Sequence, residues 1–347
     1  MATQTLNNPA QRIGRIKGEF LAHAMPVEVL AHGMGMKSMP KNGGELIIYR
    51  RWIPFGSTLA NPNRFTVDPI AHITQEGVTP NADVLTPQDV TVQIQQYACL
   101  YALTDKTVDL SEDGAAIPGE MKKQVGERMG LVREMIRYGV LRASTNRFFA
   151  GGTSRATTDE RMTLPLLRRI TRGMKLNHAK MKTSILAPSP NYQTAPVEAG
   201  YMVFASTDVE SDIRDLPKFT PTAEYGSRKP VCAEEIGSCE NFRFCLSPEL
   251  TSWPDSGAAV GATGLFSTTG ANIDVYPVIV MAEDAAHDVA LRGGASLDPT
   301  WLPPGTKDKN DPLGQRGYIG AKFYSAAFVS NHGWMAVAEV GITNITS

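Results

Sequence analysis

The stretch Asp311-Pro312-Leu313-Gly314-Gln315-Arg316-Gly317 decides how the chain is interpreted. It follows a loop rich in proline and glycine, Leu302-Pro303-Pro304-Gly305-Thr306, and precedes the apolar run Tyr318-Ile319-Gly320-Ala321-Lys322-Phe323-Tyr324. Proline fixes the backbone, and glycine permits conformations that other residues avoid. The local pattern therefore predicts a structured turn that leads into a β-strand.

Composition narrows the class of protein. At 347 residues the chain is longer than most single compact cores, which favours two or more lobes. Hydrophobic residues make up 42% and charged residues 20%, so a substantial core is expected. The formal net charge is −1, and no global basic excess is present to bind nucleic acid. We expect no secretory signal and no transmembrane helix, because no run of about 20 apolar residues occurs.

Metal and disulfide chemistry is weakly indicated. The four cysteines, Cys99, Cys232, Cys239 and Cys245, contain no C-x-x-C pair, and free thiols in a reducing compartment are the favoured interpretation. The glycine-rich stretch 257–264 is followed by no Gly-Lys-Ser/Thr, so we expect a surface loop and not a phosphate-binding loop.

Two strands joined by a long polar excursion predict an extended β-arm. The first strand is expected over 45–55, and the second over 89–105, where Val90, Val92 and Ile94 alternate with polar residues. A connection of about thirty residues is unusual inside a compact domain and points to a functional segment.

A long amphipathic helix is predicted over 118–149. Met121, Val125, Met129, Val132, Ile136 and Val140 form one apolar stripe, with Pro118 in the first turn and Gly151-Gly152 as the stop. Gly126, Gly130 and Gly139 permit close approach of another backbone, or bending.

The rest of the chain predicts a mixed α/β lobe. Helices are expected over 164–176 and from Thr207 or Asp208 to Leu216, with a short helix within 16–30. Further strands are expected over 183–187, 201–205, 243–246, 273–281, 318–328 and 334–340.

The stretch from Arg142 to Lys182 is strongly basic and includes Arg161, Arg168, Arg169 and Arg172. Such a patch can contact DNA phosphates or pair with acidic residues of another subunit. Aromatic residues for base stacking are sparse there, which favours the ion pairs.

One candidate catalytic or metal cluster is present. On a helix, Asp284 would share a face with His287 and with Asp288. The favoured alternative is a strand-to-helix turn whose acidic residues lie at the helix N-terminus.

Short motifs occur in order across most of the chain. They are Glu76-Gly77-Val78-Thr79-Pro80, Ala205-Ser206-Thr207-Asp208-Val209-Glu210, Phe219 to Gly226, Glu235-Ile236-Gly237, Asp274-Val275-Tyr276-Pro277 and Asp311 to Gly317. This ordered set resembles the major capsid proteins of tailed bacteriophages, in particular the N-four-like podovirus family.

This resemblance implies an α+β fold of the Hong Kong 97 type. Its parts would be an N-terminal arm over 1–44, the arm called the E-loop over 45–105, a peripheral domain with a spine helix over 106–163, an axial domain over 164–310, and C-terminal strands over 311–347 that return to the peripheral domain. The opening motif would then be the turn at which the chain leaves the axial domain. We expect Arg316→Ala to impair folding or shell assembly.

The implied function is structural and not enzymatic. Copies of the chain would form hexamers and pentamers of an icosahedral shell around double-stranded DNA, with a portal and with scaffold or decoration proteins as further partners. No cofactor, metal or membrane is implied, and assembly would take place in the bacterial host cytoplasm. Candidate interface residues are Arg50, Arg51, Trp52, Phe55, Glu76 and Arg316. The alternatives are a cellular nanocompartment shell of the same fold and an α/β enzyme that uses Asp284, His287 and Asp288.

Overall fold

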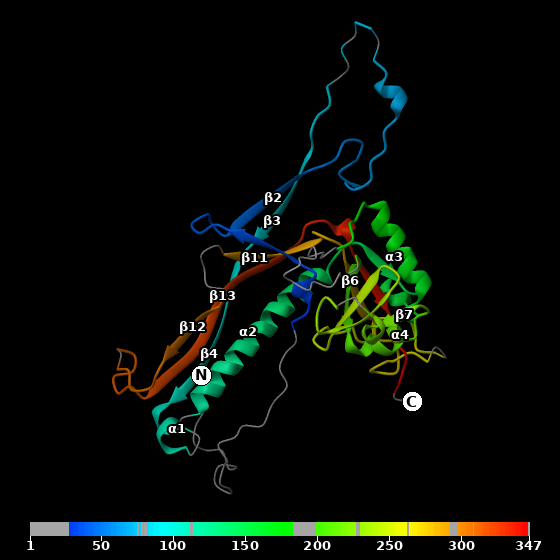
Figure 1. Cartoon of the computed structure of the whole chain (residues 1–347). Coiled ribbons are helices and arrows are strands. Elements are labelled where there is room, and N and C mark those ends of the chain that lie inside the picture. The colour runs from blue at the N-terminus through cyan, green and yellow to red at the C-terminus, as the bar shows by residue number, and fades with distance from the viewer. Residues whose placement is uncertain are drawn as a thin grey trace.

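The computed structural model describes residues 28–345 except 75, 78, 80–81, 112–113, 115, 183–198, 227–229, 262–263, 292–296 and 308. An elongated lobe and a rounder lobe are joined by one long helix, and an arm projects from the elongated lobe (Figure 1).

The elongated lobe contains a five-stranded sheet centred on β13 (Arg316–Val329). Along one side β13 pairs with β4 (Gln95–Thr104); along the other it pairs first with β12 (Asp298–Leu302) and then with β11 (Ala286–Leu291). β1 (Gly35–Met39) adds to β11 in parallel. The motif-bearing C-terminal strand is therefore the centre of this sheet.

The rounder lobe contains a seven-stranded sheet. Its order is β5 (Arg147–Phe149), β14 (Met335–Val340), β10 (Tyr276–Met281), β6 (Tyr201–Ser206), β9 (Phe242–Ser247), β8 (Glu235–Cys239) and β7 (Phe219–Pro221). The four strands β14, β10, β6 and β9 are buried along their whole length. Their continuous apolar runs are typical of strands that are covered on both faces.

Two helices cover these faces. Helix α3 (Leu164–Leu176) buries Leu167, Ile170 and Met174 against one face of the seven-stranded sheet. Its bounds agree with the prediction, because Pro165 suits the first turn and the apolar spacing is regular. The other face packs against the end of the long helix α2.

Helix α2 (Ile117–Leu141) connects the two lobes. Val125 and Met129 pack against β4 and β13 of the elongated lobe, and Tyr138 and Leu141 pack into the core of the rounder lobe. The predicted apolar stripe is confirmed. The predicted end at 149 is wrong: Ser144, Thr145 and Asn146 are poor helix formers, and Arg147–Phe149 form β5 beside β14.

The arm begins with β2 (Leu46–Trp52) paired antiparallel with β3 (Pro87–Gln93). Its root packs on the elongated lobe, where the Tyr49 ring stacks on Phe328 with centroids 4.9 Å apart. The described residues among 53–86 extend beyond this pair, and Pro69–His72 form a short 3-10 helix there. The predicted β-arm is confirmed, and the predicted second strand is divided into β3 and β4.

The short elements complete the chain. They are α1 (Asp105–Leu110), α4 (Glu210–Arg214) and the 3-10 helices Leu30–His32, Arg155–Thr157, Thr207–Val209, Thr222–Glu224 and His332–Trp334. The predicted strand over 183–187 and most of the predicted helix within 16–30 lie outside the described residues.

Four strands lie in a different lobe from the one predicted. β11 and β12, expected in the axial part over 164–310, pair with β13 in the five-stranded sheet. β14, expected to return with the other C-terminal strand, lies in the seven-stranded sheet, and so does β5 from the part over 106–163. Pairing between strands that are distant in the sequence decides lobe membership, and a division into consecutive blocks misses it.

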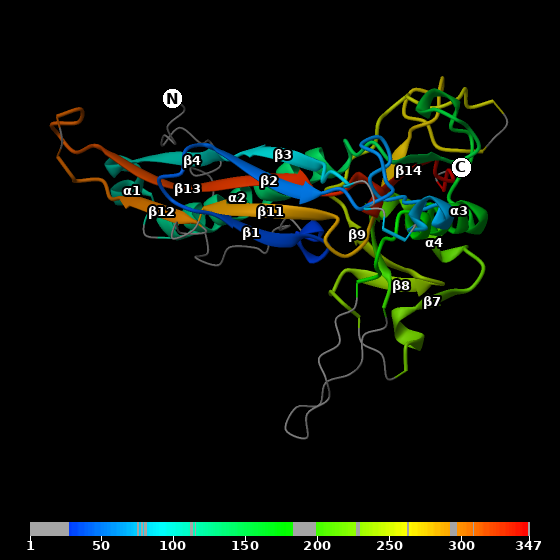
Figure 2. The ribbon, with the colours of Figure 1, turned by 90° about the horizontal axis from the view of Figure 1, so that it is seen from above.

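The opening motif forms the tip of the β12–β13 hairpin. This tip lies at the end of the elongated lobe away from the rounder lobe (Figure 2), so the prediction that it joins the two lobes is wrong. The predicted tight geometry is present: Gly314 has φ +69°, its carbonyl accepts from Gly305 N at 2.7 Å, and Asp311 Oδ2 accepts from Arg316 N at 2.7 Å.

Candidate inter-subunit surfaces

The arm concentrates exposed apolar side chains. Of the 20 exposed large apolar residues in the described part of the chain, eleven lie on it: Leu46, Ile48, Trp52, Phe55, Leu59, Phe65, Val67, Ile70, Ile73, Val84 and Leu85. Exposed apolar side chains gathered in this way on one segment indicate an interaction site.

The two faces of β2 differ in what they contact. Ile47, Tyr49 and Arg51 face the elongated lobe and are half-buried, while Leu46, Ile48, Arg50 and Trp52 face outward and are exposed. The outward face thus has an apolar character that its own subunit does not use.

The predicted interface residues on the arm occupy different environments. Trp52 is 56% exposed and Phe55 is 53% exposed, with an edge contact to His72. Arg50 already pairs with Asp89 across the strands, Nε to Oδ1 at 2.8 Å. Arg51 donates to the amide oxygen of Gln88, and Glu76 is exposed.

Arg316, the remaining candidate, lies far from the arm. It begins β13 at the hairpin tip, pairs with Thr104 in the β4 register and is exposed. Its backbone N–H donates a hydrogen bond to Asp311 Oδ2. No hydrogen bond or ion pair of its guanidinium is found within the described residues. The structure does not bring Arg316 together with the arm residues.

Two of the four candidate arginines of the basic patch are neutralised inside the chain. Arg168 pairs with Glu240 at 2.6 Å, and Arg161 Nη1 lies 3.5 Å from both Asp212 and Asp215. Arg169 donates to the Phe149 carbonyl oxygen. For Arg161 and Arg168, the acidic partners expected on another subunit are therefore found in the same chain, and Arg172 on α3 is exposed.

A buried ion network that the sequence analysis missed fixes the start of the described chain. Glu134 of α2 is fully buried, and its Oε1 accepts from the backbone N–H groups of Val29 and Leu30 at 2.9 and 2.8 Å. Arg137 Nη2 donates to Asp288 at 2.8 Å, and its Nη1 lies 3.1 Å from Glu28. These contacts join the N-terminal segment, α2 and β11.

Electrostatics and packing both support this network. Burial lowers the pKa of Arg137, but the hydrogen bond and charge of Asp288, together with Glu134 and Glu28, outweigh burial and raise it. A Cβ at Gly130 would lie 2.5 Å from Glu28 Oε1, so glycine allows this close approach. One sequence signal could have indicated this network. The spacing of Glu134, Arg137, Tyr138 and Leu141 places them on one helical face, beside the apolar stripe.

The candidate cluster Asp284, His287 and Asp288 does not form a common site. The predicted helix is absent, because Asp284 lies in a turn with φ +56° and residues 286–291 form β11. His287 Nε2 lies 3.6 Å from Asp284, whereas Asp288 contacts Arg137 on the other face of the strand. Alternation along a strand separates the two side chains.

The structure also bears on metal and membrane chemistry. The four cysteines are free and buried, with Cys232 Sγ and Cys245 Sγ 3.1 Å apart. Within the described ranges, no group of three or more His, Cys, Asp or Glu side chains could hold a metal ion. No helix of the described chain has the length and apolarity to cross a membrane.

Comparison with known proteins gives a consistent result. No protein-family model matches the chain. The major capsid protein of Pseudomonas phage KPP21 is 20% identical over 345 residues, covering 87% of this chain and 85% of that protein.

Solved structures resemble the whole chain. The capsid of Ralstonia phage GP4 has a TM-score of 0.64 at 12% identity and covers 99% of both chains. The capsid of cyanophage Pam1 has a TM-score of 0.60 at 12% identity, covering 99% of this chain and 100% of the other. The head structure of Helicobacter pylori bacteriophage KHP40 has a TM-score of 0.58 at 10% identity and covers 98% of each chain.

The likeness extends over both lobes and the arm, because nearly every residue of each chain is covered. The predicted α+β class and the resemblance to phage major capsid proteins are thereby confirmed, and the narrower N-four-like assignment stays a prediction. The chain has the Hong Kong 97-type fold, the fold of these phage capsid subunits.

Proposed function

We propose that the chain is a bacteriophage major capsid protein whose copies assemble into hexamers and pentamers of an icosahedral shell enclosing double-stranded DNA. The observation that carries the proposal is the arm: eleven exposed large apolar side chains project from a subunit that has the fold of phage capsid proteins.

Physical chemistry supports a second copy as the partner of the arm. A two-stranded ribbon is at best marginally stable alone, and its outward apolar face gains free energy when another surface covers it. In an assembly of identical copies, that surface is another subunit. Trp52 and Phe55 are the largest exposed apolar side chains near the start of the arm, and we place them in this contact.

The proposal includes partners and a location. Portal, scaffold or decoration proteins would complete the particle, and packaged DNA would be contacted without sequence specificity. The net charge of −1 and the internally paired Arg161 and Arg168 favour weak DNA contact. The shell would form in the cytoplasm of the bacterial host and remain in the virion, and no catalytic residue is part of the proposal.

The test compares assembly and folding in the same protein. Wild-type protein should form closed particles in negative-stain electron microscopy and sedimentation. Trp52→Ser combined with Phe55→Ser should leave a folded subunit that forms few or no particles. Leu176→Ser, which changes an apolar residue that is 48% exposed on α3, is the matched control and should assemble normally. Equal assembly of the double variant and the control would refute the role of the arm.

A further inference from the structure

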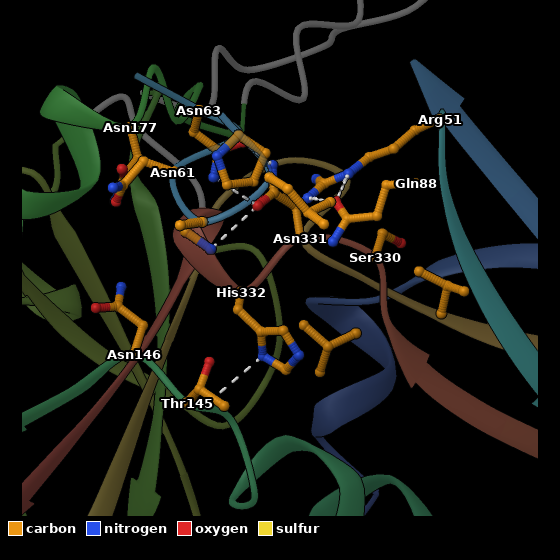
Figure 3. A pocket seen from close by; sticks show the side chains of 16 residues that line it. Arg51, Asn61, Asn63, Gln88, Thr145, Asn146, Asn177, Ser330, Asn331 and His332 are labelled. Atoms are coloured by element: carbon orange, nitrogen blue, oxygen red, sulfur yellow. Dashed lines mark hydrogen bonds between the residues drawn. The ribbon is translucent and has the colours of Figure 1, made fainter. Parts of the chain in front are cut away.

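A polar cavity lies where the arm meets the rest of the subunit. It has a volume of about 480 Å³ and is lined by four separate parts of the chain: the arm, residues 145–146, Asn177 and residues 329–333 (Figure 3). Because the arm supplies one wall, the cavity depends on how the arm is held.

The wall supplied by the arm is fixed by paired amides. Asn63 Nδ2 donates to Asn331 Oδ1, and Asn331 Nδ2 donates to Asn63 Oδ1, both at 2.7 Å. Asn331 is buried, and its Oδ1 also accepts from Gly333 N at 3.1 Å. A Cβ at Gly333 would lie 2.2 Å from Asn63 Nδ2, so this pairing needs glycine.

A second contact holds the same segment. The Phe65 ring stacks on His178, with centroids 4.5 Å apart and planes 11° apart. The cavity is thus preorganised before any ligand binds, which lowers the entropic cost of binding.

The cavity contains one full charge and no acid. Its lining includes Arg51 but neither aspartate nor glutamate. Arg51 Nε and Nη2 both donate to Gln88 Oε1, at 2.8 and 2.5 Å, and Figure 3 shows the guanidinium extending from β2 to this amide. A neutral amide does not balance the charge, and Arg51 has no ion pair within the described residues. A half-buried cation without a counter-ion has lost part of its hydration, and no opposite charge compensates for that loss.

His332 also lines the cavity. Its Nδ1 lies 3.1 Å from Ser144 Oγ and 3.5 Å from the backbone N of Thr145. Burial and the charge of Arg51 both lower the pKa of His332, which keeps the ring neutral near pH 7. The cavity therefore holds polar side chains and one guanidinium without a counter-ion, and a guanidinium is the group that pairs best with an oxyanion.

The arm of the chain carries the matching acids. Between Ile53 and Thr86 the sequence has Asp68, Glu76 and Asp83 but only one basic residue besides His72, Arg64. The three carboxylates are exposed, and none has an ion pair among the residues that the structure describes. Arg51 and these acids lie on one chain, so in an assembly of identical copies one copy can supply what another lacks.

We propose that this cavity receives a carboxylate side chain from the arm of a second copy, Asp68, Glu76 or Asp83, which pairs with Arg51. The inference rests on the proposed self-assembly and adds to it a specific polar contact, separate from the apolar outward face of the arm. Arg51 gives this contact its charge, and the surrounding amides and His332 restrict its geometry.

The test is charge reversal in assembled particles. Arg51→Gln should lower the equilibrium constant for particle formation about tenfold, with an unchanged melting temperature of the isolated subunit. Arg51→Glu should lower it further, and one of Asp68→Arg, Glu76→Arg or Asp83→Arg should restore assembly in that background. Arg214→Gln is the matched control, because it removes the same charge from an exposed arginine paired with Glu210 on α4.

The outcomes separate the inference from the proposed function. If wild-type protein forms shells and Arg51→Gln assembles like Arg214→Gln, or if no reversal rescues Arg51→Glu, the inference is overturned while the capsid function stands. If sulfate raises the melting temperature of the wild-type subunit through Arg51 and no reversal rescues, the cavity is a free-anion site and the inference is again overturned. If wild-type protein never forms shells, both fail.

Discussion

Replacing Glu134 with alanine should release the N-terminal segment from α2. In the structure the fully buried Glu134 accepts two backbone hydrogen bonds, from Val29 at 2.9 Å and Leu30 at 2.8 Å. Leaving a buried donor unsatisfied costs about 1–3 kcal/mol, so two donors set a range of about 2–6 kcal/mol. Because the segment can partly rehydrate, we expect a loss of about 3 kcal/mol in the free energy of unfolding.

Two measurements check this prediction. Urea unfolding gives the global loss, and amide hydrogen exchange at Val29 and Leu30 reports the local release. Glu134→Gln keeps an acceptor but loses the charge, so it should lie between alanine and wild type. Lys123→Ala, at an exposed site on the same helix, should stay within about 0.5 kcal/mol of wild type. Unchanged protection of both amides in Glu134→Ala would refute the reasoning.

Three further predictions concern other parts of the subunit. Gly314→Ala places a side chain at φ +69° against Gly305 and should cost about 1–2 kcal/mol in urea unfolding; a neutral effect would contradict the strained turn. Burial lowers the pKa of His287, and nearby positive charge adds to this, so its contribution to stability is present above about pH 6.5 and lost as pH falls through the folded-state value. His287→Gln should therefore show a smaller fall in urea midpoint between about pH 7.5 and about pH 5 than wild type, and equal falls would contradict this. Asp212 accepts from Thr343 Oγ1 at 2.5 Å and Thr343 N at 2.9 Å, so Asp212→Asn should cost about 1–3 kcal/mol and speed amide exchange at Thr343, whereas unchanged exchange would count against the contact.

Local patterns in the sequence predicted the elements well. The alternation of Val90, Val92 and Ile94 gave the arm strand, and the apolar stripe of α2 was placed on the correct face. These features depend on neighbours a few residues apart, which is the range at which periodicity carries information.

Long-range pairing could not be predicted in the same way. Nothing near β11 or β12 indicates that both pair with β13, and nothing near 147–149 indicates a strand beside β14. Such pairings depend on complementary surfaces that are brought together only in the folded chain.

The candidate sites show the same contrast between local patterns, which the sequence reveals, and contacts between distant residues, which it does not. Trp52 and Phe55 were named from the sequence as large apolar residues of a β-arm that the resemblance places against another copy, and both are exposed in the subunit. The internal partners of Arg161 and Arg168 lie tens of residues away, and no local signal assigns an ion pair over that separation. The Asn63–Asn331 pair, which shapes the cavity at the arm root, was hidden for the same reason.

A cryo-electron microscopy map of the purified protein after assembly tests the central claim most directly. The account predicts closed icosahedral shells in which the arm of each copy lies across a neighbour and both Trp52 and Phe55 are buried in that contact. Protein that remains monomeric under every assembly condition, or shells in which these two side chains face solvent, would contradict it.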